Sequence, residues 1–144
     1  GIYSDALSLF DKVQEKQAII SVMGRSLGSG AATYLASKRS VEKMVLVSPY
    51  DSIKNVAQNK FPIYPMFLLL KDKYDSIGRV KEIQAKTIVL MAENDEVIPK
   101  KHSLRLISEF PPEQITVKTI SNTGHNDISN KMEYYDHLSS FLNN

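Results

Sequence analysis

A serine between two glycines stands where an apolar strand pattern gives way to a helical pattern of small residues. The segment reads GRSLG, with Ser26 at its centre, and follows the apolar run Ala18–Met23. A tight strand–turn–helix connection strains the backbone of such a serine and pushes its hydroxyl out of the fold. Gly24 and Gly28 are expected to let strand and helix approach without Cβ clashes. Ser26 is therefore a candidate nucleophile; the alternative is a serine that caps the helix in a glycine-rich turn.

The backbone N–H that follows the serine could assist the same chemistry. The N–H of Leu27 is expected to point into the space in front of the Ser26 hydroxyl. It lies at a helix N-terminus, where unpaired N–H groups and the helix dipole favour negative charge. Leu27 N–H is therefore a candidate donor to an oxyanion.

A nucleophilic serine needs a base, and the chain has three histidines. His125 lies in the loop sequence SNTGHND after the last strand pattern. Loops at the carboxyl ends of parallel strands are where such sheets carry their sites, so His125 is the candidate base. His102 and His137 lie within helical patterns and are expected to be surface or packing residues.

The acid that orients the base should follow another strand. The sequence AENDEVIP, after the apolar run Lys86–Met91, offers three carboxylates. Asp95 is the preferred acid because the Val-Ile-Pro after it can anchor the loop, Glu93 is the second choice, and Glu96 is expected to be solvated. The resulting order is nucleophile, acid, base, which differs from the orders of the chymotrypsin and subtilisin triads.

The elements that would position these residues alternate along the chain. Four apolar runs predict buried strands, at 18–23, 43–48, 86–91 and 114–120, and the last alternates enough to suggest an edge strand. Helices are predicted at 5–13, with Ser4 as N-cap, and at 26–38, 75–83, 100–110 and 131–142, with a short helix after residue 50. This pattern predicts one α/β domain over residues 1–144, with a mostly parallel sheet covered by helices on both faces.

Composition excludes several classes of function. The 144 residues are 42% hydrophobic and 24% charged, with a net charge of +2, which gives no basic face for nucleic acid. The absence of cysteine excludes disulfides and thiolate chemistry and fits a cytoplasmic location. The scattered histidines lack metal-ligand spacing, and the glycine-rich turn lacks the lysine of a phosphate loop, so no metal or other cofactor is expected.

One apolar segment has no role in this scheme. Phe61–Leu70 contains two prolines and is shorter than the roughly 20 residues of a membrane helix, so no stable membrane insertion is expected. It is expected to pack on the sheet as a cap or crossover; the alternative is an acyl-binding cap or a membrane-surface contact.

The four segments together resemble the α/β-hydrolase superfamily. VMGRSLGSGAATYLASKR resembles its nucleophile elbow, VLVSPYDSI the next strand and wall loop, KTIVLMAENDEVIP the acid segment, and TGHND the histidine loop. The resemblance implies a serine hydrolase, of the esterase or serine aminopeptidase-like kind, that acts on a small-molecule acyl substrate through an acyl-enzyme. It makes Ser26 the nucleophile, Asp95 the acid, His125 the base and Leu27 N–H an oxyanion donor. Ala92 departs from the glycine that is usual at its position.

The resemblance also identifies what this sequence lacks. The family has about four strands before the elbow strand, and one of their loops supplies the second oxyanion N–H. The sequence begins with Gly rather than Met, at the helix before the elbow strand, and so corresponds to the C-terminal portion of the fold. The alternative function is therefore a truncated, non-catalytic module. Without those strands, Ala18–Met23 becomes an open edge, which predicts a homo-oligomer or pairing with another strand.

Overall fold

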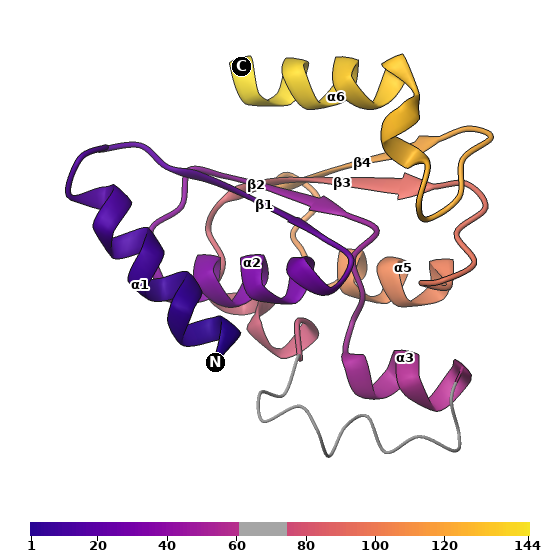
Figure 1. Cartoon of the computed structure of the whole chain (residues 1–144), viewed down its shortest axis with the longest axis horizontal. Helices are drawn as coiled ribbons and strands as arrows, with labels where there is room; N and C mark the ends of the chain where they lie inside the picture. Colours follow the sequence, from indigo (N-terminus) through magenta and orange to yellow (C-terminus); the bar gives the residue numbers. More distant parts are fainter. Residues whose placement is uncertain (61–74) are drawn as a thin grey trace.

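The computed structural model describes residues 1–60 and 75–144, so the segment Phe61–Leu70 lies outside the described residues. Figure 1 shows a twisted sheet with helices on either side. The sheet has four parallel strands in the order β1-β2-β3-β4. Their bounds are Ser21–Arg25, Lys43–Val47, Lys86–Ala92 and Ile115–Ile120. The predicted parallel α/β sheet of about four strands is confirmed, as is the edge position of the last strand.

One face of the sheet is covered by α1 (Ile2–Gln14), α2 (Leu27–Lys38) and α5 (Lys100–Ser108), with the 3₁₀ helix η1 (Ile77–Glu82) beside them. Side chains alternate along each strand, so Met44 and Leu46 of β2 face this side. They pack with Val89 of β3, Leu35 of α2 and Leu106 of α5 in the larger core.

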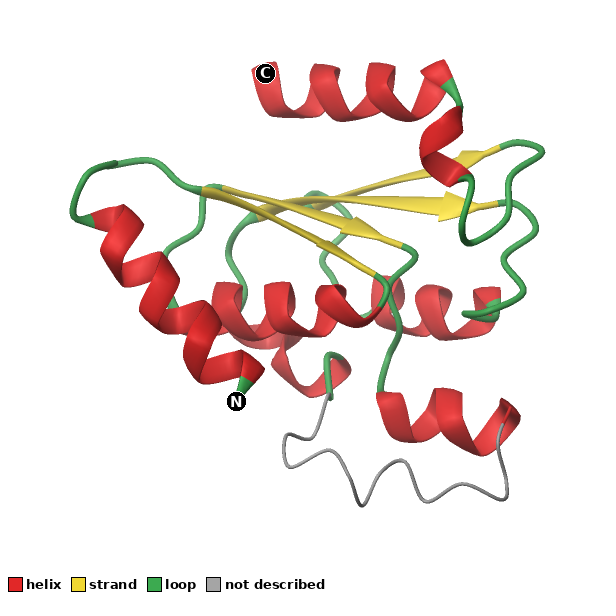
Figure 2. Cartoon of the chain, viewed as in Figure 1, coloured by secondary structure: helices red, strands yellow, loops and turns green. Residues whose placement is uncertain are grey.

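The opposite face is covered by α6 (Met132–Asn143), preceded by the short 3₁₀ helix η2 (Ile128–Asn130). Figure 2 shows both helices on this side of the strands. Val45 and Val47, which alternate with the residues of the other core, pack here with Leu90, Ile128 and Tyr134. The prediction of helices on both faces is therefore confirmed.

Several element boundaries differ from those predicted. The first helix begins earlier, with Gly1 rather than Ser4 as N-cap, because the Ser4 hydroxyl donates back to the Gly1 carbonyl from within the first turn. The first strand is Ser21–Arg25 rather than 18–23, since pairing with Lys43–Val47 sets its register. The predicted helix 75–83 is a 3₁₀ helix, and the short helix after residue 50 is α3 (Ile53–Lys60).

The last strand residue of β3 is Ala92, which lies in register with Ile120. Its side chain is buried in the core beneath α6. The strand continues through this position without interruption, so the methyl group is accommodated where the resemblance noted in the sequence implied glycine. Within residues 1–60 and 75–144, no helix combines the length and the apolar character needed to cross a bilayer.

Candidate active site

Ser26 occupies a strained turn between β1 and α2. Its φ of 51° and ψ of −119° lie in a region that non-glycine residues rarely adopt. The turn is held from both sides: Ser26 N–H donates to the Val47 carbonyl at 2.9 Å, and Ser29 Oγ donates to the Ser26 carbonyl at 2.6 Å. The strain is maintained by this bonding, which fixes the backbone from which the Ser26 hydroxyl projects.

The two glycines around Ser26 have different roles. A Cβ on Gly24 would lie 2.4 Å from the Gly28 carbonyl oxygen and 2.7 Å from Ala32 Cβ, so Gly24 is required for strand and helix to meet. A Cβ on Gly28 would meet nothing within 4 Å. The expectation that both glycines prevent clashes is therefore correct for Gly24 and wrong for Gly28 among the described residues. Gly28 instead borders an apolar groove between α1 and β1.

The imidazole of His125 lies directly against the carboxylate of Asp95. His125 Nδ1 is 2.9 Å from Asp95 Oδ2 and 3.1 Å from Oδ1, and both side chains are at least nine-tenths buried. Asp95 Oδ1 also accepts hydrogen bonds from the N–H groups of Val97 and Ile98, at 2.9 and 2.8 Å. The Val-Ile-Pro segment thus holds the carboxylate toward the histidine, as the sequence suggested.

The surroundings keep the Asp95 carboxylate ionised. Burial by itself raises its pKa, but hydrogen bonds from His125 and from Ile98 N–H, with the nearby Ser48 hydroxyl, outweigh burial and lower the pKa below its usual value. An ionised Asp95 accepts a hydrogen bond from a protonated Nδ1, which fixes the tautomer of the His125 imidazole. The other ring nitrogen, Nε2, is then the one able to accept a proton.

The loops that carry these residues are joined to one another. The Arg25 guanidinium, next to Ser26, donates to the His125 carbonyl at 2.7 Å. The acid and histidine loops are joined by Asn94 N–H, which donates to the Thr123 carbonyl at 2.9 Å. All three loops follow the carboxyl ends of strands, which Figure 2 shows at one edge of the sheet. The elbow, acid and base segments therefore meet where a parallel sheet places its sites.

The other candidates lie elsewhere. The Glu93 carboxylate bonds the main chain instead: its Oε2 accepts a hydrogen bond from Asn122 N–H at 2.7 Å and so braces the histidine loop. Glu96 is exposed and borders a cavity of about 580 Å³ between the acid and histidine loops. His137 lies 3.4 Å from Glu133 on α6. In residues 1–60 and 75–144, no group of three or more His, Asp and Glu side chains could hold a metal ion.

His102 belongs to a second buried pair that the sequence did not predict. It is 1% exposed, and its Nδ1 lies 2.9 Å from Oδ1 of Asp51, which is fully buried. Asp51 was not among the candidate residues. The signal that could have identified it is its position, since it follows the end of β2 as Asp95 follows the end of β3.

A scan against protein-family models found no match. The chain is 34% identical over 111 residues to an uncharacterised protein of Mycobacterium tuberculosis, MT2364, covering 76% of this chain and 39% of that protein. It is 31% identical over 114 residues to a putative alpha/beta hydrolase of Acanthamoeba polyphaga mimivirus, L404, covering 78% of this chain and 41% of that protein. The chain thus spans about two fifths of the length of these relatives.

Comparison with solved structures adds evidence on the fold. The alpha/beta hydrolase enzyme MGS-MChE2, from a sediment metagenome of the lagoon of Mar Chica, superposes with a TM-score of 0.72 at 16% identity. The match covers 99% of this chain and 69% of that structure. At this identity the likeness shows the fold, and the fold agrees with the layers and strand order described above.

Proposed function

Because the chain belongs to the α/β-hydrolase superfamily and carries the C-terminal portion of its fold, we propose that it is the catalytic part of a serine hydrolase. The reaction is cleavage of an ester, thioester or peptide-like bond through an acyl-enzyme. The observation that carries this proposal is the buried contact between His125 and Asp95, in a histidine loop that Arg25 joins to the strained turn at Ser26.

The first half of the reaction forms the acyl-enzyme. Ser26 Oγ attacks the substrate carbonyl carbon while His125 Nε2 takes the hydroxyl proton, and a tetrahedral intermediate results. Asp95 stabilises the imidazolium through Nδ1–H and remains ionised, which agrees with its lowered pKa. The proton then passes from Nε2 to the leaving oxygen, sulfur or nitrogen as the carbonyl–leaving group bond breaks.

The second half releases the acid. Water attacks the acyl carbon and gives its proton to His125 Nε2, and the Ser26 oxygen leaves and recovers that proton. In both halves the negative oxygen of the intermediate accepts a hydrogen bond from Leu27 N–H, at the first position of α2, where no intrahelical acceptor exists. The family supplies a second donor from a loop that precedes the elbow strand. Loss of one such donor costs about 3–4 kcal/mol of transition-state stabilisation.

The proposal is tested with a fluorophosphonate probe, which forms a covalent bond only with an activated serine. Labelling of the protein at Ser26 is expected, with complete loss in Ser26→Ala and a large loss in His125→Ala and Asp95→Asn. Ser37→Ala is the matched control, because Ser37 lies at the far end of the same helix and its hydroxyl donates to the Tyr34 carbonyl there. Absence of labelling in the longest form of the protein, with the fold intact, would overturn the proposal.

The alternative of a non-catalytic module gains no support from the comparisons. The names of the relatives and of the superposed structures that state an activity refer to hydrolases. A non-catalytic role would leave the cost of a strained Ser26 and a buried His125–Asp95 pair without a benefit. The same labelling experiment separates the two functions.

A further inference from the structure

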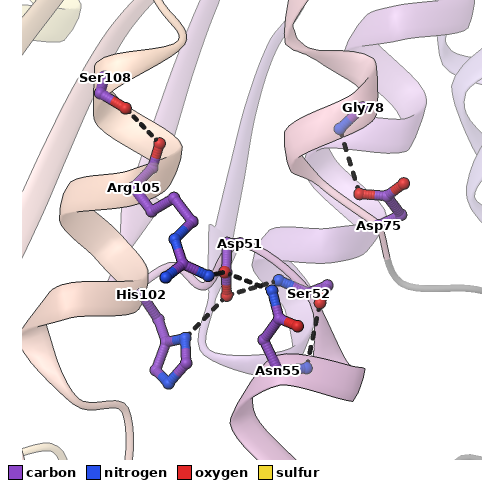
Figure 3. Close-up of polar contacts among 8 residues, drawn as sticks. All are labelled: Asp51, Ser52, Asn55, Asp75, Gly78, His102, Arg105 and Ser108. Atoms are coloured by element: carbon purple, nitrogen blue, oxygen red, sulfur yellow. Dashed lines mark hydrogen bonds and ion pairs between the residues drawn. The ribbon is translucent and has the colours of Figure 1, made fainter.

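A second buried carboxylate–imidazole pair lies outside the proposed triad, between the segment after β2 and helix α5. Figure 3 shows Asp51 at the centre of this cluster. Its Oδ1 accepts Ser52 N–H at 2.8 Å and lies 2.9 Å from His102 Nδ1. Its Oδ2 accepts Asn55 Nδ2 at 2.7 Å and Arg105 at 3.0 Å. Both carboxylate oxygens of a fully buried group are thus used to join α3 to α5.

Helix α5 begins directly after the acid loop. Ile98 N–H donates to Asp95, Pro99 caps α5, and the His102 N–H donates back to the Pro99 carbonyl at 2.9 Å. The position of the first turn of α5 therefore determines where Ile98 lies, and Ile98 in turn bonds the acid. A contact at His102 acts on Asp95 through one turn of helix.

The segment joined to α5 also contacts the elbow. The Tyr50 hydroxyl donates to the Leu27 carbonyl at 3.2 Å, and the Tyr50 ring packs with Ile98. The Ser103 hydroxyl of α5 donates to the Pro49 carbonyl. At the start of the segment, Ser48 has a φ of 48° and a buried hydroxyl close enough to Asp95 to help lower its pKa. Residues 48–51 thus lie between the elbow and the acid loop and touch both.

We propose that Asp51 and His102 form a positioning pair, which locks residues 48–51 to α5 and so sets the separation between the elbow at Ser26 and the acid at Asp95. Neither residue touches the reacting atoms. The pair acts through Tyr50 on one side and through Ile98 on the other. The predicted effect of this pair on the labelling rate at Ser26 rests on the proposed function. Its predicted effect on the contact between His125 and Asp95 is independent of any activity.

The structure offers variants that separate positioning from mere packing. His102→Leu removes the hydrogen bond to Asp51 and retains an apolar side chain. His102→Asn places an amide N–H near the position of Nδ1 and preserves the bond, so it is the rescue variant. His137→Leu makes the same change at a histidine of α6 that lies outside the cluster. Arg105→Leu removes one donor to Asp51 from a side chain that is 54% exposed.

Two measurements test the proposal in the protein as it exists. The first is the NMR signal of the His125 Nδ1 proton, which reports its contact with Asp95 and needs no substrate. The second is the rate of fluorophosphonate labelling at Ser26. His102→Leu should shift the His125 signal and slow labelling about 10- to 100-fold, because a misplacement of about 1 Å costs about 100-fold. His102→Asn should restore most of both, and His137→Leu should change neither.

The outcomes are distinguishable. An unchanged His125 signal in folded His102→Leu overturns the positioning pair, even if the melting temperature falls. If His102→Leu does not fold, Arg105→Leu decides, with a smaller shift in the same direction expected and no shift contradicting the proposal. Failure of the longest form of the protein to react with the probe overturns the proposed hydrolase function alone, since the His125 signal still tests the pair.

Discussion

The Arg25 guanidinium donates a 2.7 Å hydrogen bond to the main-chain carbonyl of His125, although the two residues are 100 positions apart in the chain. Arg25 is the last residue of β1 and directly precedes Ser26, so this bond joins the elbow to the histidine loop. The guanidinium of Arg25 is planar and carries several N–H donors, which suits it to hold a carbonyl in one position. The bond therefore links the position of His125, the proposed base, to that of Ser26, the proposed nucleophile.

Arg25→Met should move the histidine loop while preserving the apolar stem of the side chain. The expected results are a loss of about 1.5–3 kcal/mol in the free energy of unfolding, the range for a hydrogen bond from a charged donor, and slower labelling of Ser26. Arg25→Lys should give an intermediate labelling rate, because a single flexible ammonium replaces the planar guanidinium. Equal labelling rates for the parent protein and Arg25→Met would show that the bond does not position His125.

The strained backbone at Ser26 predicts that replacing the serine by glycine increases stability at the expense of the proposed nucleophile. Ser26→Gly removes the Cβ that makes φ 51° costly, whereas Ser26→Ala removes the hydroxyl and retains the strain. We expect Ser26→Gly to be more stable than Ser26→Ala by about 1 kcal/mol, after the entropy cost of glycine in the unfolded chain. Urea unfolding of the two variants measures this difference, and a less stable Ser26→Gly would contradict the strained geometry.

The two glycines of the elbow should respond differently to alanine. Gly24→Ala places a methyl group 2.4 Å from a backbone carbonyl that cannot move away without displacing α2, so a loss of about 1–3 kcal/mol or more is expected. Gly28→Ala meets nothing within 4 Å and adds a better helix former, so stability should be unchanged or rise by up to about 1 kcal/mol. Equal losses in the two variants would contradict the close approach assigned to Gly24 alone.

Much of this site follows from local sequence pattern, since Ser26, Asp95 and His125 each follow an apolar run that forms a strand. Parallel strands bring their carboxyl ends to one edge, so strand order in the chain was enough to place the three loops together. His102 was different, because its helical pattern did not reveal that Asp51 packs against it. That contact depends on how α5 settles on the segment after β2, which no local pattern encodes. The empty space beside Gly28 could not be predicted for a similar reason, because it depends on which element lies next to β1.

The lowered pKa of Asp95 predicts a specific acid sensitivity. A carboxyl group whose pKa is lower in the folded state adds stability above its unfolded pKa, and that stability is lost as the pH falls through the folded value. The loss is therefore expected below about pH 4, the ordinary value for aspartate. Asp95→Asn should show a shallower fall in the free energy of unfolding across that range. An identical pH dependence in both proteins would contradict the assigned shift.

The open edge of β1 predicts association of the 144-residue chain. Among the described strands, β1 pairs on one side only, with β2, and Met23 and Ile19 are 47% and 69% exposed. The apolar groove described above, of about 470 Å³, runs beside this edge and is lined by residues of α1, β1 and α2. Unpaired N–H and carbonyl groups next to apolar side chains are a template for another strand, so we propose that this edge pairs with a second copy of the chain.

Light scattering on the isolated chain measures this association. The parent chain should be larger than a monomer, and Met23→Lys should shift it toward the monomer, because a charge on the edge opposes pairing. Val117→Lys makes the same change at an exposed apolar residue of the opposite edge strand β4, so it is the matched control and should leave the association unchanged. A monodisperse monomer that melts cooperatively would contradict the proposal. It would show that β1 is stable without a neighbouring strand and that its exposed apolar edge does not cause association.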